Sequence, residues 1–204
     1  MTSQPKFQAA RPDADKALRG RILACLPHAM AFDGVGFRSV GMKYATEGDL
    51  LSGHGASCYG GRWNPPGMRA VYVSLSPVTA VKEAYQLFLR NGISAAQIRP
   101  RVLAGLHLRV QRLLDLTDTS VRRRVGFRLR DLLEEWAAIQ HQGGEAGTQS
   151  VGRCAFELGF EGLLAPSVQD PHGSNLVVFP ERLLPGSELL VMAAGDLPPH
   201  PLAC

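Results

Sequence analysis

Three polar residues occupy positions where chemistry is plausible. Arg38 lies in the apolar run VGFRSV, where burial of an unpaired guanidinium is unfavourable. Arg38 must therefore meet a carboxylate, a carbonyl or an anionic ligand, and a structural ion pair would serve as well as a ligand. Glu83 lies at the border of an apolar helical stripe, and Ser167 ends an expected strand. Taken singly, Glu83 is typical of a solvated helix residue and Ser167 of a turn residue.

A glycine- and proline-rich stretch, SCYGGRWNPPGMRAVYVS at residues 57–74, is unusual for a surface loop because it contains a tryptophan. Glycines let a backbone approach a ligand closely, and prolines stiffen a loop. Such a stretch is typical of a loop that lies close to a ligand. The wider segment 48–67 has no helical or strand period and is expected to be a long loop, which is uncommon without a function.

The surrounding elements alternate between short strands and a few helices. Ser76 and Pro77 are an N-cap and a first-turn proline, and they predict a helix that ends before Asn91 and Gly92. Helices are expected at about 13–31, 77–90, 127–140 and 153–158, and strands at about 35–40, 70–76, 102–117, 162–167 and 175–180. This mixture predicts an α+β fold rather than a doubly wound sheet.

Composition narrows the class of protein. The chain has 204 residues, 45% of them hydrophobic and 20% charged, which is typical of one globular domain. No apolar run is long enough to cross a membrane, and the first residues lack the apolar core of a secretory signal. We expect a cytoplasmic protein that does not bind membranes.

The charge and cysteine patterns argue against a metalloprotein and against a nucleic-acid-binding protein. The 4 cysteines form no C-x-x-C pair, and the 6 histidines have no paired spacing, so no metal site is expected. The net charge is +4 and the basic residues cluster between Arg122 and Arg130. Such a cluster is usually a solvated face; otherwise it would meet an acidic partner protein or a phosphate-bearing ligand. Without interleaved aromatic residues or a known motif, direct nucleic-acid binding is not expected.

Common catalytic and nucleotide-binding motifs are missing. The segment around Gly53 and Gly55 lacks the third glycine of G-x-G-x-x-G, and the sequence has no P-loop, no H-E-x-x-H and no G-x-S-x-G. Instead, FRSV, GGRWNPPG, VYVSLSP, TAVKEA, EGLLAPS and NLVVFP follow one another in an order that resembles the RES domain family. The family is named for an Arg, a Glu and a Ser, which on this match are Arg38, Glu83 and Ser167. Ser174 lies close by and is an alternative for the serine.

The resemblance implies a domain organisation and a fold. It predicts an N-terminal helical extension at 1–33, a RES domain at 34–182, and a C-terminal segment at 183–204 with a disordered tail. RES proteins resemble ADP-ribosyltransferases in fold. We therefore expect a single α+β domain in which two small, curved, mostly antiparallel sheets and their helices surround an NAD cleft.

The resemblance also implies an activity and a partner. Many RES proteins are toxins paired with an Xre-like helix-turn-helix antitoxin, and they break the nicotinamide–ribose bond of NAD by phosphorolysis or hydrolysis. NAD would be the substrate, with phosphate as co-substrate in phosphorolysis. One alternative is a protein ADP-ribosyltransferase that uses NAD as donor; another is an inactive RES-type binding module.

The catalytic roles implied by the resemblance belong to Arg38, Glu83 and Ser167. The carboxylate of Glu83 would stabilise the oxocarbenium-like cation left on the ribose. The guanidinium of Arg38 would hold phosphate or ribose oxygens, and the hydroxyl of Ser167 would bind one of these oxygens. The residues expected to bind NAD are Arg38, Arg62, Tyr72, Ser74 and Asn175, with the ring of Tyr72 stacked on the nicotinamide. The glycine-rich loop would present Arg62, and Trp63 would either stack on the ligand or pack under the loop.

Overall fold

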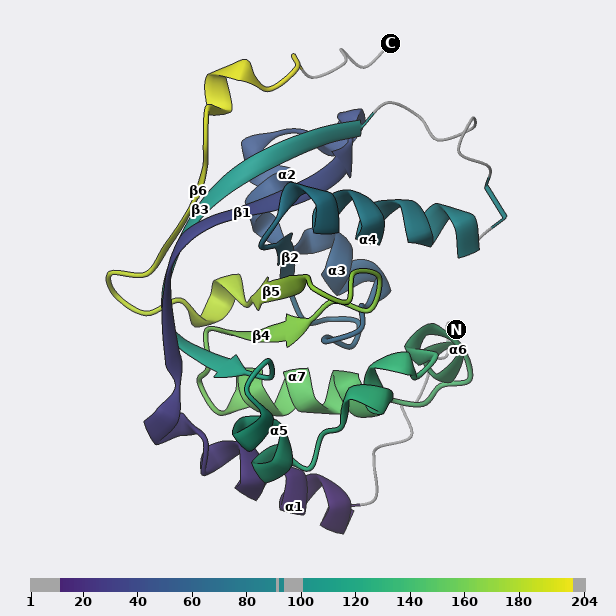
Figure 1. Ribbon diagram of the computed structural model, residues 1–204, viewed down its shortest axis with the longest axis vertical. Coiled ribbons are helices and arrows are strands. Elements are labelled where there is room, and N and C mark those ends of the chain that lie inside the picture. The colour runs from purple at the N-terminus through teal and green to yellow at the C-terminus, as the bar shows by residue number, and fades with distance from the viewer. Residues whose placement is uncertain (1–11, 91, 94–100, 200–204) are drawn as a thin grey trace, which may run out of the picture.

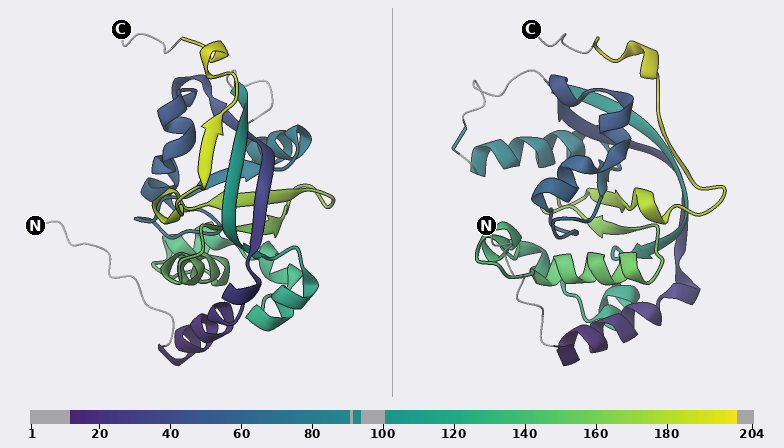
Figure 2. Two further views of the ribbon diagram at one scale, coloured as in Figure 1. Left: turned by 90° about the vertical axis from the view of Figure 1, so that its left-hand side faces the viewer. Right: turned by 180° about the vertical axis from the view of Figure 1, so that it is seen from behind.

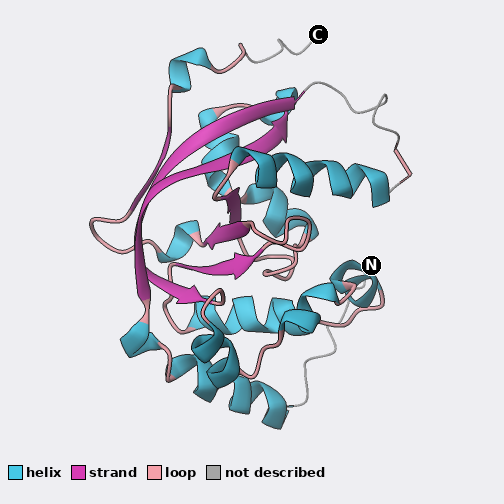
Figure 3. Ribbon diagram, viewed as in Figure 1, coloured by secondary structure: helices cyan, strands magenta, loops and turns pink. Residues whose placement is uncertain are grey.

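The computed structural model describes residues 12–90, 92–93 and 101–199 (Figure 1). They form one domain in which a curved sheet is bordered by two groups of helices. Figure 1 shows α2, α3 and α4 around its upper half and α1, α5, α6 and α7 around its lower half. The predicted α+β class in a single domain is confirmed, as the distribution of helices and strands in Figure 3 shows.

The strands of the described residues belong to one six-stranded, mostly antiparallel sheet of order β1-β2-β5-β4-β3-β6. Their bounds are β1 Met30–Gly41, β2 Val71–Ser74, β3 Arg101–Asp115, β4 Gly162–Pro166, β5 Ser174–Val178 and β6 Glu188–Val191. Only β3 and β4 pair in parallel in this sheet. β1 pairs with β3 along its whole length and also with β2, so the pairings close a ring.

The expectation of two separate sheets is therefore corrected. β1 and β3 have 12 and 15 residues, so each is long enough to run through both halves of the fold and join them. Figure 2 shows these two long strands side by side with β6 on the outside of the molecule. Residues 183–204 were expected to be a C-terminal segment outside the RES domain; β6 lies in this segment and pairs with β3.

The helices agree only in part with the expected ones. Their bounds are α1 Pro12–Leu23, α2 Glu47–Ser52, α3 His54–Tyr59, α4 Pro77–Arg90, α5 Thr119–Val125, α6 Trp136–His141 and α7 Gly147–Glu157. The expected helix 77–90 is confirmed as α4. The expected loop 48–67 is wrong for its first part, which forms α2 and α3. The single helix expected at 127–140 is also wrong, because a 3-10 segment, Leu129–Leu133, and α6 replace it.

Two hydrophobic clusters lie on opposite faces of the sheet. Successive residues of β4 show this alternation: Leu163 belongs to the cluster that contains Trp63 and Phe160, and Leu164 to the cluster that contains Leu50. The first cluster packs α1, α5 and α7 on the sheet, and the second packs α2. The two clusters hold the helices against the sheet that carries the polar residues.

Parts of some expectations lie outside the described residues. Asn91, expected at the helix stop, is one, and residues 200–204 of the tail are others. In the described ranges, no helix combines the length and apolar character that crossing a membrane requires.

Candidate active site

A cleft with a volume of about 1120 Å³ opens between the C-terminal half of β1, β2, the α2–α3 pair and α4. Most of the residues that the sequence singled out line it: Arg38 from β1, Tyr72 and Ser74 from β2, Glu83 from α4, and Asn175 from β5. Residues distant in the sequence are brought together because β2 pairs with both β1 and β5.

Glu83 is held through one of its two carboxylate oxygens. Ser167 donates its hydroxyl to Oε1 of Glu83 at 2.6 Å, and the side-chain amide of Asn175 donates to the same oxygen at 2.7 Å. Ser74 in turn donates its hydroxyl to Oδ1 of Asn175 at 2.7 Å. Among the described residues, Oε2 of Glu83 accepts no hydrogen bond. The carboxylate is therefore fixed in orientation while one oxygen remains available.

Ser167 rather than Ser174 contacts the glutamate. Ser174 pairs with Pro166 at the start of β5, and its backbone carbonyl accepts a hydrogen bond from Leu75. Ser167 is 7% exposed and follows β4 directly. The structure thus brings Arg38, Glu83 and Ser167 to one region, with Ser167 behind Glu83 as its hydrogen-bond donor.

The turn after Ser167 is tied to α4. The Ser167 hydroxyl accepts a hydrogen bond from the backbone of Asp170 at 3.0 Å. The Asp170 carboxylate accepts one from the Thr79 hydroxyl at 2.7 Å and forms an ion pair with Lys82 at 2.9 Å. The Thr79 hydrogen bond, followed by the Lys82 contact, lowers the pKa of Asp170. Because Thr79, Lys82 and Glu83 share α4, this tie fixes the distance between Ser167 and Glu83.

Arg38 is half-buried on the cleft wall. It donates to the backbone carbonyl of Leu50 at 2.9 Å, and it forms no ion pair within the described part of the chain. Burial lowers the pKa of Arg38, and the nearby charge of Asp49 partly opposes this effect. Of the partners expected for Arg38, the structure supplies a carbonyl. Since a guanidinium has five N–H donors, further donors remain for an anionic ligand.

Two cleft cations were missed by the sequence analysis. Lys43 and Arg101 also line the cleft. Arg101 donates to the hydroxyl of Ser39 at 3.0 Å and lies over the ring of Phe88, 5.1 Å from its centroid. No local signal marks Arg101, because its place opposite Gly41 and beside Ser39 depends on the pairing of β1 with β3.

Arg62 does not line the cleft. Its guanidinium donates to the backbone carbonyls of Leu132 and Glu134, the latter at 3.1 Å. Trp63 is buried and packs on Phe127 with ring centroids 5.5 Å apart. The G-G-R-W-N stretch thus supports the cleft from behind, and of the two roles weighed for Trp63 the structure shows packing.

An arginine and a glutamate on the cleft wall, with a serine hydrogen-bonded to the glutamate, are the three residue types for which RES proteins are named. The sequence matches the RES domain over residues 36–198. The chain therefore belongs to the RES domain family.

Relatives of known name carry the comparison further. The chain is 31% identical over 157 residues to the NAD(+) phosphorylase MbcT of Mycobacterium tuberculosis and of Mycobacterium bovis, which covers 74% of this chain and 77% of the relative. Its fold is similar to a chain in the crystal structure of the M. tuberculosis MbcT–MbcA toxin–antitoxin complex. That match has a TM-score of 0.64 and 26% identity, and it covers 88% of this chain and 94% of the other.

Proposed function

We propose that this chain is the toxin of a toxin–antitoxin pair and that it breaks the nicotinamide–ribose bond of NAD, with inorganic phosphate as the acceptor. One observation carries the proposal: a glutamate on the cleft wall is anchored through Oε1 by Ser167 and Asn175. The similarity to an NAD(+) phosphorylase over most of both chains supports the substrate and the acceptor. This chemistry would act on the NAD pool of the cytoplasm.

The reaction breaks one bond and forms one. The bond between ribose C1 and the nicotinamide nitrogen breaks with its electron pair going to that nitrogen, so nicotinamide leaves as a neutral molecule. Positive charge develops on the ribose, and the carboxylate of Glu83 stabilises it. A phosphate oxygen then forms the new bond to C1 and gives ADP-ribose 1-phosphate.

The remaining cleft residues have three roles. Arg38, Lys43 and Arg101 supply positive charge for the phosphates of NAD and for the attacking phosphate. The ring of Tyr72 offers an aromatic face for the nicotinamide. Ser74 acts through Asn175 to orient Glu83. Arg62 has no ligand role in this proposal, because it binds the backbone outside the cleft.

A partner protein belongs to the proposal, since unchecked cleavage would exhaust the NAD of the cell. The similar structure is that of a toxin–antitoxin complex. We therefore propose an antitoxin partner of the Xre-like helix-turn-helix type.

The purified chain with NAD, in buffers with and without inorganic phosphate, tests the function by chromatography of the products. We expect nicotinamide release that accelerates with phosphate. Release at the same rate in both buffers would make water the acceptor, and transfer of ADP-ribose to protein would make the chain an ADP-ribosyltransferase. Absence of any nicotinamide release from folded protein would contradict the proposal.

A further inference from the structure

The phenol of Tyr72 is fixed from the side away from the cleft. Its hydroxyl donates to Oδ1 of Asn64 at 2.7 Å and accepts a hydrogen bond from the backbone of Trp63 at 2.9 Å. Burial raises the pKa of Tyr72 far above that of a free phenol, so the hydroxyl stays protonated as a donor. The ring lines the cleft, and its orientation is therefore set by the loop behind it.

Asn64 has no freedom to move within that loop. Its side chain is fully buried, and its amide nitrogen lies within hydrogen-bond distance of the carbonyls of Ala56, Met68 and Pro65 at 2.9, 2.9 and 3.2 Å. Its only side-chain acceptor, Oδ1, faces Tyr72. The amide thus joins the end of α3 and the approach to β2 to one phenol.

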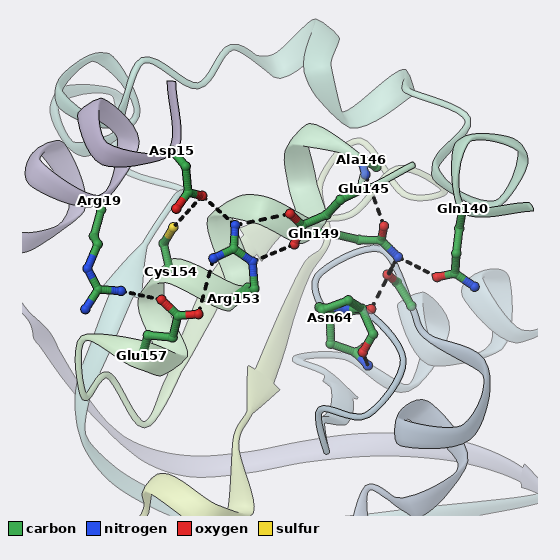
Figure 4. Close-up of polar contacts among 12 residues, drawn as sticks. Asp15, Arg19, Asn64, Gln140, Glu145, Ala146, Gln149, Arg153, Cys154 and Glu157 are labelled. Atoms are coloured by element: carbon green, nitrogen blue, oxygen red, sulfur yellow. Dashed lines mark hydrogen bonds and ion pairs between the residues drawn. The ribbon is translucent and has the colours of Figure 1, made fainter. Parts of the chain in front are cut away.

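Gln149 of α7 contacts the same loop (Figure 4). It is 1% exposed, and its amide nitrogen contacts the carbonyls of Gly61 and Asn64 at 3.1 and 3.3 Å and Oε1 of Gln140 at 2.7 Å. Its own Oε1 accepts a hydrogen bond from the backbone of Ala146 at 3.1 Å. Every polar atom of this side chain is engaged, and its amide nitrogen contacts both the loop and Gln140 of α6.

Two glycines show how tightly the layers meet. A Cβ on Gly152 of α7 would lie 1.7 Å from the carbonyl oxygen of Trp63, and a Cβ on Gly61 would lie 2.5 Å from the hydroxyl of Tyr72. Real Cβ atoms cannot approach other atoms so closely. Helix α7, the loop and Tyr72 are therefore stacked in direct contact, and a shift of the loop would move the phenol.

We propose that Asn64 and Gln149 are positioning residues that hold the Tyr72 ring in the orientation that receives the nicotinamide. The inference rests on the proposed function, because it assigns NAD to the cleft. It assigns a role to Asn64 of the glycine-rich loop, for which the sequence analysis predicted none.

A double-mutant cycle with Gln149→Met and Tyr72→Phe tests the link. Methionine has similar volume but no donor, so the loop carbonyls lose their hydrogen-bond partner. We expect Gln149→Met to raise KM for NAD about five- to tenfold with kcat within about twofold, because about 1.4 kcal/mol corresponds to tenfold. The Tyr72→Phe variant already lacks the hydroxyl that bonds Asn64 and the backbone of Trp63. In this background, Gln149→Met should change KM by less than about twofold. Additive effects on KM would overturn the proposal.

Arg153→Met is the matched control on the same helix. Arg153 contacts the carboxylates of Asp15, Glu145 and Glu157 and thereby ties α7 to α1, away from the loop (Figure 4). We expect this variant to unfold at lower temperature and to keep its KM for NAD. A rise in KM equal to that of Gln149→Met would reduce the role of Gln149 to general support of α7 and refute positioning.

A spectrum that does not involve NAD separates this inference from the proposed function. With tyrosine rings labelled by ¹³C, the Tyr72 signal is assigned by its loss in Tyr72→Phe. It should shift or broaden in Gln149→Met and stay in place in Arg153→Met. Should Gln149→Met fail to fold, Gln149→Asn keeps an amide that is one methylene too short and should give the same shift. An unchanged Tyr72 signal overturns the positioning role, whereas a wild-type protein inactive on NAD overturns the proposed function alone.

Discussion

Replacement of Glu83 by glutamine isolates the charge of the carboxylate from its shape. The amide oxygen of glutamine can take the place of Oε1 and accept both hydrogen bonds, from Ser167 at 2.6 Å and Asn175 at 2.7 Å. The new NH₂ group then occupies the position of Oε2, which accepts no hydrogen bond from the described residues. The variant should therefore fold and bind NAD as the original does.

The expected loss is large because the charge opposes a developing cation. Two unit charges about 4 Å apart interact by about 4 kcal/mol at the effective dielectric constant of a protein surface site. Removal of one preorganised electrostatic group commonly costs about 100- to 1,000-fold in kcat, or about 3–4 kcal/mol. The two figures agree, so we expect Glu83→Gln to lower kcat by about 100- to 1,000-fold.

Initial rates of nicotinamide release over a range of NAD concentrations measure this effect, with thermal unfolding as the check on folding. The change should fall on kcat, and KM should stay within a few-fold, because the interaction forms in the transition state. A folded Glu83→Gln protein that retains kcat within about tenfold of the original would refute the electrostatic role of Glu83.

Two further predictions concern the cleft wall and the turn behind it. Arg38→Lys keeps the charge but loses the planar fork of donors, so kcat/KM for NAD should fall at least about tenfold in the same assay; unchanged kinetics would reduce Arg38 to a generic positive charge. The pKa of Asp170 is lowered by Thr79 and Lys82, so the folded state binds fewer protons there than the unfolded state. Its contribution to stability is present at neutral pH and is lost as pH falls through the folded pKa, below the ordinary value of about 3.9. In urea titrations, Asp170→Asn should be less stable than the original at pH 7, and the difference should shrink in acid; a difference independent of pH would contradict this reasoning.

Elements with strong local signals could be predicted from the sequence. Helix α4 was predicted because Ser76 caps it, accepting a hydrogen bond from the backbone of Thr79 at 3.0 Å, and Pro77 begins it. The apolar surroundings of Arg38 were enough to predict that its guanidinium needs a partner. The grouping of Arg38 with Glu83 and Ser167, however, came from the family resemblance. Spacing alone favoured a solvated helix residue for Glu83 and a turn residue for Ser167.

Elements set by distant contacts could not be predicted. α2 and α3 have 6 residues each, too few to show a helical period. The apolar period at 127–140 suggested one helix, but the chain is extended at Glu134, whose carbonyl accepts from Arg62 and whose carboxylate accepts from the backbone of Gly147. The same contact keeps Arg62 out of the cleft. The sequence could not show this, because nothing local distinguishes an arginine that binds a ligand from one that binds a backbone 72 residues away.

Identifying which bond of NAD breaks is the most direct test of the proposed activity. ³¹P NMR of the purified chain with NAD and inorganic phosphate follows the reaction in one sample. If phosphate cleaves the nicotinamide–ribose bond, the pyrophosphate signals persist while inorganic phosphate is consumed and a new phosphomonoester signal grows, in step with free nicotinamide. Conversion of the pyrophosphate signals to those of a mononucleotide, or a spectrum of NAD that stays unchanged with folded protein, would contradict cleavage at the nicotinamide–ribose bond.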